Sequence, residues 1–213
     1  MTHNPRQHAR AAGILYLLTH VTSVAAVLAY GSGLLIGGVT LEFVLAIGCV
    51  GTGVLMGVLL RRHGPARAAT FALLRAVEAS VIIAGALPML AIAQLAGTWA
   101  QWTAGASALH TASFLLGQGL VISVNTIVLG WLLWDSRSVP RGLATLGVAG
   151  GTIVFASNLA QLWAVIPLNG VAAGVAALPV FSFELWLAIY LIVRGLRPHG
   201  PTTVAPSIEA ASA

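Results

Sequence analysis

Four ionisable side chains lie inside long apolar stretches of the chain, where they could do chemistry that exposed charges cannot: Glu42, Arg75, Glu78 and Glu184. A carboxyl buried without a counter-charge tends to be protonated, and a protonated carboxyl can act as an acid or pass on a proton. Arg75 and Glu78 are three residues apart, so they share one face of a helix. Since one arginine cannot pair with three glutamates, we predict a buried polar site rather than a purely structural ion pair.

Histidine and amide side chains occur in the same stretches: His20, His110, Gln118, Asn125, Asn158 and Gln161. Gln118 and Asn125 are seven residues apart, and Asn158 and Gln161 three, so each pair lies on one helical face. A single amide of this kind is usually structural and contributes roughly 0.6 kcal/mol per interhelical contact. Together these residues give every predicted helix a polar group near its middle. We therefore predict one connected polar core, with His110 near its outer mouth.

The composition excludes a soluble fold. Of 213 residues, 58% are hydrophobic and only 7% are charged, against about 25% charged in a typical soluble domain. The ten basic residues are all arginines, which excludes a Schiff-base or P-loop lysine. One cysteine, Cys49, allows neither an intrachain disulfide nor a thiolate metal cluster. We predict an all-α protein of the membrane.

Six apolar stretches reach the length of about 20 residues that a helix needs to cross a bilayer. We predict a six-helix transmembrane domain over residues 11–197, preceded by a short segment at 1–10. Residues 198–213 are rich in Pro, Ala, Ser and Thr, which predicts a disordered tail. The predicted spans are Ala11–Tyr30, Leu34–Leu60, Ala68–Leu95, Ser107–Trp134, Gly142–Pro167 and Val175–Val193.

The arginines indicate the orientation of the bundle. Nine of the ten flank the apolar stretches on one side, whereas the connections 31–33, 96–106 and 168–174 carry no charge. By the positive-inside rule, we predict that both termini and the segments 1–10 and 198–213 are cytoplasmic. The net charge of +5 reflects this asymmetry, so we expect no nucleic-acid partner.

Several blocks of sequence carry a resemblance to a known family: AGILYLL in the first span, LEFVLAI around Glu42, LRAVE with Arg75 and Glu78, FLLG at 114–117, VPR at 139–141, and LPVFSFELWLAIYLIVRGLRP around Glu184. Through them the chain resembles the bacterial six-span membrane proteins of domain-of-unknown-function family 4386 (DUF4386), from about residue 10 to 198. It differs in a short first loop and in the HTAS sequence before FLLG, where the family usually has an acidic and aromatic pair. The resemblance implies a bacterial inner-membrane location and no known activity.

We predict that the site binds or translocates a small molecule or a proton, with the three glutamates as its polar determinants and Arg75 as counter-ion or anion ligand. One alternative is an intramembrane enzyme in which a neutral glutamate protonates a lipid or isoprenoid. Another is a structural protein whose polar core serves fold specificity.

Glutamates with His20 and His110 could ligate a metal on chemical grounds. The spans, however, hold no Glu-x-x-His pair of the kind that di-iron bundles use, so we expect no metal and no other cofactor. The expected partners are the lipid bilayer and a small hydrophobic or anionic ligand. A homo-oligomer is left open.

Overall fold

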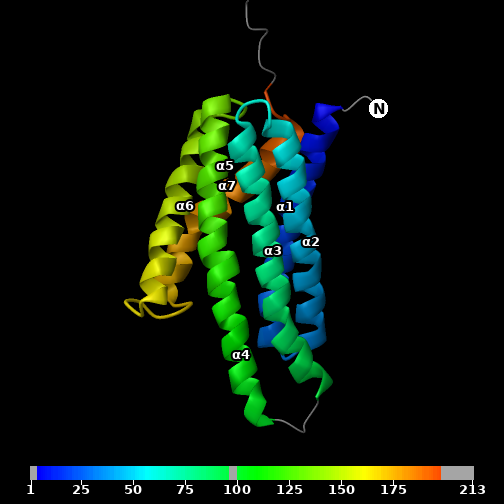
Figure 1. The fold of residues 1–213 in the computed structure, drawn as a ribbon, viewed down its shortest axis with the longest axis vertical. Helices are drawn as coiled ribbons and strands as arrows, with labels where there is room; N and C mark the ends of the chain where they lie inside the picture. The colour runs from blue at the N-terminus through cyan, green and yellow to red at the C-terminus, as the bar shows by residue number, and fades with distance from the viewer. Residues whose placement is uncertain (1–3, 96–99, 198–213) are drawn as a thin grey trace, which may run out of the picture.

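The computed structural model describes residues 4–95 and 100–197, which form an all-helical bundle (Figure 1). Within these ranges, six spans are long and apolar enough to cross a membrane. Residues 1–3, the connection 96–99 and the predicted tail at 198–213 lie outside the described residues. The elements are α1 (Pro5–Gly31), α2 (Leu35–Leu60), α3 (Pro65–Gln94), α4 (Ala100–Phe114), the π-helix η1 (Leu115–Val121), α5 (Ile122–Ser136), α6 (Arg141–Leu162) and α7 (Val171–Val193).

The prediction of an all-α, six-span membrane protein is confirmed, although several helices extend beyond their apolar stretches. The first helix begins at Pro5, where Asn4 caps it by accepting a hydrogen bond from the backbone of Arg6 at 3.1 Å. Proline in the first turn costs no helical hydrogen bond, so the polar start of the chain joins the helix. The fourth span is helical from Ala100, so residues 100–106 are not the loop that the sequence predicts.

The fourth span also contains a π-helix, at η1, where the sequence predicts regular α-helix throughout. Gly117 and Gly119 lie in this segment and face neighbouring helices. A Cβ atom on Gly117 would come within 3.0 Å of Val81, and one on Gly119 within 2.8 Å of Asn158. The π-helical segment therefore packs closely against both α3 and α6. Insertions of this kind are frequent at functional sites.

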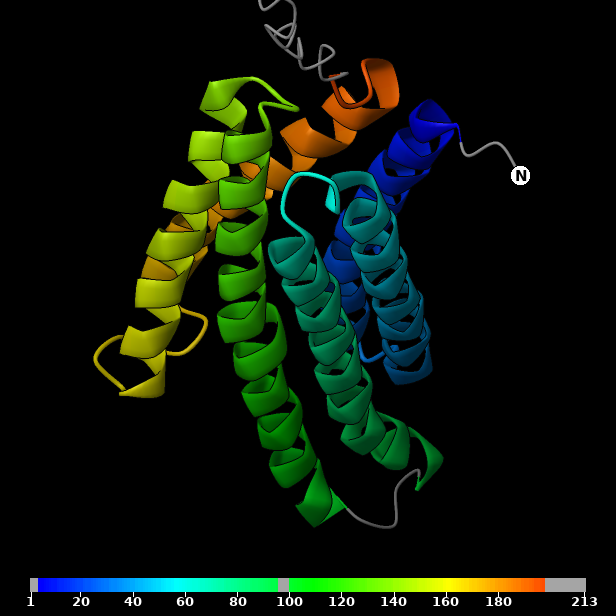
Figure 2. The same cartoon turned by 45° about the horizontal axis from the view of Figure 1, so that its top comes forward.

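The spans pack in chain order around a ring, and α7 returns to α1 to close it (Figure 2). The closure depends on Gly13, whose Cβ position lies only 2.6 Å from the carbonyl oxygen of Ala188. Glycine thus lets the α1 and α7 backbones approach closely. Both ends of the described chain lie at the same end of the ring (Figure 1).

The two ends of the ring differ in their interior. The end that carries the loop arginines is filled by an apolar cluster that includes Met56, Phe71, Leu132 and Leu187, all essentially inaccessible. At its surface, Arg67 forms an ion pair with Asp135. The opposite half of the ring holds the polar side chains and the cavities described below. Large apolar side chains cover the outside of the bundle, as contact with lipid requires.

Candidate functional site

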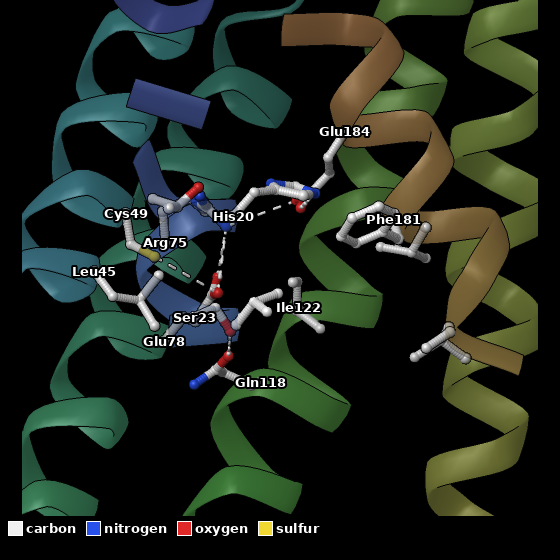
Figure 3. Close-up of a pocket in the computed structure, with 15 residues that line it drawn as sticks. His20, Ser23, Leu45, Cys49, Arg75, Glu78, Gln118, Ile122, Phe181 and Glu184 are labelled. Carbon is white, nitrogen blue, oxygen red and sulfur yellow. Dashed lines mark hydrogen bonds and ion pairs between the residues drawn. The ribbon is translucent and has the colours of Figure 1, made fainter. Parts of the chain in front are cut away.

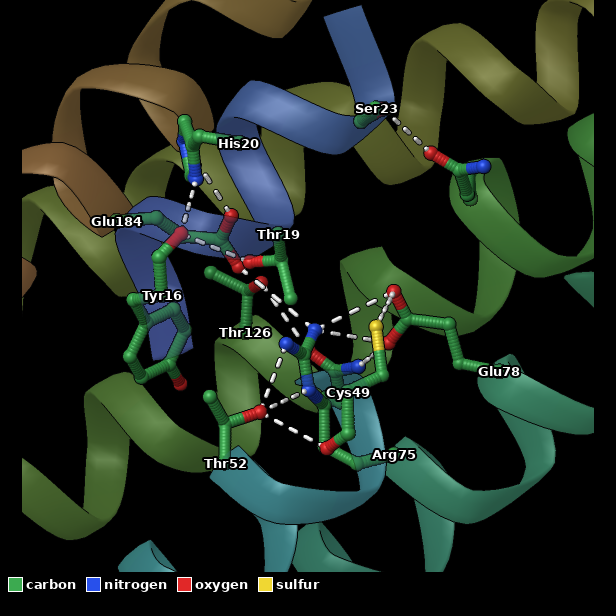
Figure 4. A network of polar contacts seen from close by, with 12 residues as sticks. Tyr16, Thr19, His20, Ser23, Cys49, Thr52, Arg75, Glu78, Thr126 and Glu184 are labelled. Carbon is green, nitrogen blue, oxygen red and sulfur yellow. Dashed lines mark hydrogen bonds and ion pairs between the residues drawn. The ribbon is translucent and has the colours of Figure 1, made fainter. Parts of the chain in front are cut away.

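Arg75 lies at the centre of a polar cluster and is held on three sides (Figure 4). Its Nε and Nη2 atoms donate hydrogen bonds to Thr52 Oγ1, at 3.1 and 2.9 Å. Its Nη1 atom donates to Glu78 Oε2 at 3.0 Å, and its guanidinium carbon lies 5.5 Å from the ring centre of Tyr16. Since Arg75 is only 2% exposed, its donors are directed at protein partners. It acts as a counter-ion within the cluster.

Glu78 is the most fully bonded carboxylate of the cluster. Besides Arg75, it accepts a hydrogen bond from Asn125 Nδ2 at 2.6 Å, and the thiol of Cys49 lies 3.7 Å from its Oε1 atom. Both oxygens therefore have donors, from α2, α3 and α5. A buried carboxyl group with this many donors has its hydrogen bonds satisfied without a ligand.

Glu184 has a different environment, although it is only 7% exposed. Its nearest charged or titratable neighbours are Arg75, with 4.0 Å between Nη1 and Oε1, and His20, with 3.7 Å between Nε2 and Oε2. Within the described residues, no hydrogen bond to this carboxylate is formed. Glu184 is thus buried with unfilled acceptor positions, which is costly unless a ligand, water or a proton fills them.

The orientation of His20 is set by the backbone of its own helix. Its Nδ1 atom lies 3.0 Å from the carbonyl oxygen of Tyr16. Because a carbonyl oxygen only accepts hydrogen bonds, Nδ1 carries a hydrogen, and Nε2 is the atom turned to Glu184. The ring of Phe181 lies against the imidazole, with 4.8 Å between ring centres. The Nε2 atom of His20 and the Glu184 carboxylate therefore face each other at 3.7 Å, without a hydrogen bond between them.

A cavity of about 190 Å³ adjoins these groups. Glu184, Glu78 and His20 form part of its wall, while Leu45, Val180 and other apolar side chains form much of the rest (Figure 3). We call it the central cavity.

A second polar group lies farther from the loop arginines. His110 Nε2 is 2.8 Å from Glu42 Oε1, and the hydroxyl of Tyr30 donates to Glu42 Oε2 at 2.7 Å. The rings of Tyr30 and His110 meet edge to face at 4.9 Å. Glu42 thus pairs with a histidine and a tyrosine, and not with Arg75. These three residues are called the outer triad.

A larger cavity, of about 460 Å³, adjoins the outer triad and is called the outer cavity. Gln118 of η1 lines both this cavity and the central one. Its Oε1 atom accepts a hydrogen bond from Ser23 at 3.0 Å, which joins η1 to α1. Gln118 therefore lies between the two cavities.

Asn158 and Gln161 line the outer cavity but bond mainly to their own surroundings. Gln161 Nε2 donates to Asn158 Oδ1 at 3.2 Å, and Gln161 Oε1 accepts from the backbone of Asn169 at 2.9 Å. Asn158 Nδ2 donates to the carbonyl of Val154 at 2.8 Å. These bonds fix the end of α6 and its following loop. The ten candidate residues thus form three groups, with Gln118 between them, rather than one bonded network.

Sequence reasoning did not single out Thr52, Tyr30 or Ser23, and it considered Cys49 only for disulfide and metal chemistry. One signal was present in α2, where Glu42, Cys49 and Thr52 recur at intervals of seven and three residues, on one helical face. Tyr30 and Ser23 carried no such signal, because single hydroxyls are common in membrane helices.

Comparison with known proteins identifies the family of the chain. The family model described as Domain of unknown function (DUF4386) matches residues 11–195. No curated protein and no solved structure matches the chain. The matched range covers most of the sequence. It includes the polar cluster around Arg75 and the outer triad. The chain therefore belongs to the DUF4386 family of integral membrane proteins.

Proposed function

We propose that this membrane protein binds a small molecule or a proton at Glu184, in the central cavity, and serves to translocate it. The observation that carries the proposal is the environment of this carboxylate, which is buried, lines a cavity and accepts no hydrogen bond from the described residues. Glu78, in contrast, is saturated by Arg75 and Asn125. In this proposal Glu184 contacts the cargo, while Arg75 and Glu78 hold the site in shape.

The wall of the central cavity supports a particular class of small molecule. It is largely apolar, with acceptor oxygens of Glu184 and the imidazole of His20 on one side. Arg75 also lines this cavity, but its Nε, Nη1 and Nη2 atoms donate to Thr52 and Glu78. A small hydrophobic molecule with a hydrogen-bond donor or a positive charge fits this arrangement better than an anion does.

The packing supports access to the proposed site from the arginine-free end of the ring. The outer cavity includes the exposed residues Asn169 and Gly174 near the arginine-free end of the ring, whereas the apolar cluster fills the other end. Passage through the protein would therefore require the helices to move. We propose that the arginine end faces the cytoplasm of a bacterial cell and that the protein lies in its inner membrane.

Native mass spectrometry of the gently solubilised protein tests the binding proposal. We expect the wild type to carry a bound mass that Glu184→Gln loses, because the amide has one acceptor fewer and no charge. Glu42→Gln is the matched control, since it changes the same residue type outside the central cavity and should retain the mass. A bound mass that persists in Glu184→Gln would contradict the assignment. A bare wild-type polypeptide would leave the proton as the cargo.

A further inference from the structure

Two histidine–glutamate pairs lie in the interior, and they are built from four different helices. The outer pair is His110 on α4 with Glu42 on α2, at 2.8 Å, and the inner pair is His20 on α1 with Glu184 on α7, at 3.7 Å. Histidine is the side chain whose charge changes near neutral pH, and a neighbouring carboxylate stabilises its protonated form. Each pair therefore places an imidazole, which can carry a proton, beside a carboxylate.

The two pairs border neighbouring cavities. His110 lines the outer cavity and His20 the central one, and Gln118 belongs to the wall of both. A small pocket between the helices also brings Glu42, His110 and Gln118 to one wall. The cavities of about 460 and 190 Å³ have room for several water molecules, each of which needs roughly 30 Å³. Their polar linings can supply the hydrogen bonds that such water requires.

We propose that these residues form a one-sided proton route, in which the Glu42–His110 pair takes up protons from the arginine-free end and delivers them past Gln118 to the His20–Glu184 pair. The inner acceptor is the central site of the proposed function, so the inference rests on that function. In this route His110 of the outer triad is the first proton acceptor. The apolar cluster beyond Arg75 ends the route.

The proton transfers balance without a further reactant. In neutral His110, Nε2 donates to the Glu42 carboxylate at 2.8 Å, so a proton from water on the arginine-free side binds Nδ1. Glu42 stabilises the imidazolium that forms, and Tyr30 keeps a hydrogen bond on the other carboxylate oxygen. The proton then moves through cavity water along Gln118 and Ser23, and His110 returns to its neutral form. It arrives at His20 Nε2 or Glu184, because His20 Nδ1 already bonds the carbonyl of Tyr16.

Other titratable and charged groups face the two pairs from the neighbouring helices. The hydroxyl of Tyr30 faces the outer pair. The guanidinium of Arg75 faces the inner pair, and behind it lie Glu78, Cys49 and the ring of Tyr16. The charges of Arg75 and Glu78 therefore surround the inner pair at the end of the route.

Time-resolved infrared spectroscopy of the full-length protein in lipid nanodiscs tests the route after a rapid drop in pH. The carbonyl band of protonated Glu184 is assigned by its loss in Glu184→Gln. We expect His110→Gln and Glu42→Gln to slow the rise of this band by about tenfold or more, since positioned acid–base groups accelerate proton transfer roughly 10²–10⁴-fold. Its final amplitude should stay the same. His110→Gln retains an amide donor toward Glu42, so it preserves the contact but cannot titrate.

Two further variants keep the result interpretable. Thr111→Val is the matched control and should leave the rate unchanged. Thr111 also lines the outer cavity next to His110, but its hydroxyl bonds only to its own helix, at the carbonyl of Ser107. Gln118→Leu interrupts the route between the pairs and should slow the band without altering either pair. Unchanged rates in His110→Gln, Glu42→Gln and Gln118→Leu would overturn the route and leave the central site intact. A wild type without a pH-dependent Glu184 band would overturn the inference, while the bound mass tests the central site separately.

Discussion

Arg75 of α3 and Glu184 of α7 face each other across the centre of the helical ring, with 4.0 Å between Nη1 and Oε1. The same Nη1 atom lies 3.0 Å from Glu78, on its own helix. The arginine is therefore hydrogen-bonded to Glu78, and its charge reaches Glu184 only as a longer ionic contact. Two buried glutamates of the same cluster thus differ in their bonding, which agrees with the structural role proposed for Glu78 and the binding role proposed for Glu184.

The first prediction concerns the stability of this cluster. Glu78→Gln should lower the free energy of unfolding by about 3 kcal/mol, the lower end of the range for breaking a buried ion pair, because Glu184 still supplies a negative charge to Arg75. Glu184→Gln should cost less than about 1 kcal/mol, since it forms no hydrogen bond with the described residues. Thermal unfolding of both variants in the same detergent measures the difference. Equal losses would contradict the division of roles.

The second prediction concerns the hydroxyl that accepts two of the hydrogen bonds from Arg75. Thr52→Val keeps the shape of the side chain but leaves Nε and Nη2 without their acceptor. We expect a loss of roughly 1–3 kcal/mol in unfolding free energy, the cost of unsatisfied buried donors. Thr40→Val is the control, because Thr40 is exposed and bonds only to the carbonyl of Ile36 on its own helix. A melting temperature of Thr52→Val equal to that of the control would show that Arg75 finds other partners.

The spans could be predicted from the sequence because bilayer thickness and backbone hydrogen bonding leave few options for an apolar run of this length. Their ends could not, because hydropathy does not record caps. Asn4 and Pro5 start α1 before the apolar stretch begins, and α4 starts at Ala100, ahead of Ser107. The π-helix could not be predicted either, since residues 115–121 have the composition of an ordinary membrane helix.

The candidate residues could be identified from the sequence, but their partners could not. A charged side chain in an apolar stretch must face the interior of the bundle, so Glu42, Arg75 and Glu184 could be identified as candidate site residues. Which of them meet depends on the rotation and depth of each helix. Glu42 lies too near the arginine-free end to reach Arg75 and pairs with His110. The wider turn of η1 places Gln118 against Ser23 of α1, a contact that no spacing rule indicates.

The third prediction concerns orientation in the membrane. Two single cysteines are introduced into a Cys49→Ser background, which keeps a donor toward Glu78. Ser32→Cys places one in the exposed α1–α2 turn, and Ala66→Cys places the other at the exposed arginine end. If the arginine end is cytoplasmic, an impermeant maleimide should label Ser32→Cys in intact cells and Ala66→Cys only after permeabilisation. The two variants serve as controls for each other. The opposite labelling pattern would reverse both the proposed orientation and the direction of the proton route.

The last prediction concerns the contact that closes the ring. Gly13→Ala places a methyl group 2.6 Å from the carbonyl oxygen of Ala188 and 2.8 Å from Ile192, so α1 and α7 must separate. We expect a loss of about 1–3 kcal/mol, as for other overpacked contacts. Because His20 lies on α1 and Glu184 on α7, the same variant should also weaken their contact. It should therefore also slow the rise of the Glu184 infrared band after a drop in pH.

Gly142→Ala is the matched control for this closure. Gly142 is helical, and nothing lies within 4 Å of its Cβ position. Alanine is the better helix former by roughly 0.5–1 kcal/mol, so stability should stay equal or rise slightly. If Gly13→Ala behaves like this control in both measurements, the close approach of α1 and α7 does not set the geometry of the inner pair. If only its stability falls, the closure supports the bundle but not the exchange of a proton between His20 and Glu184.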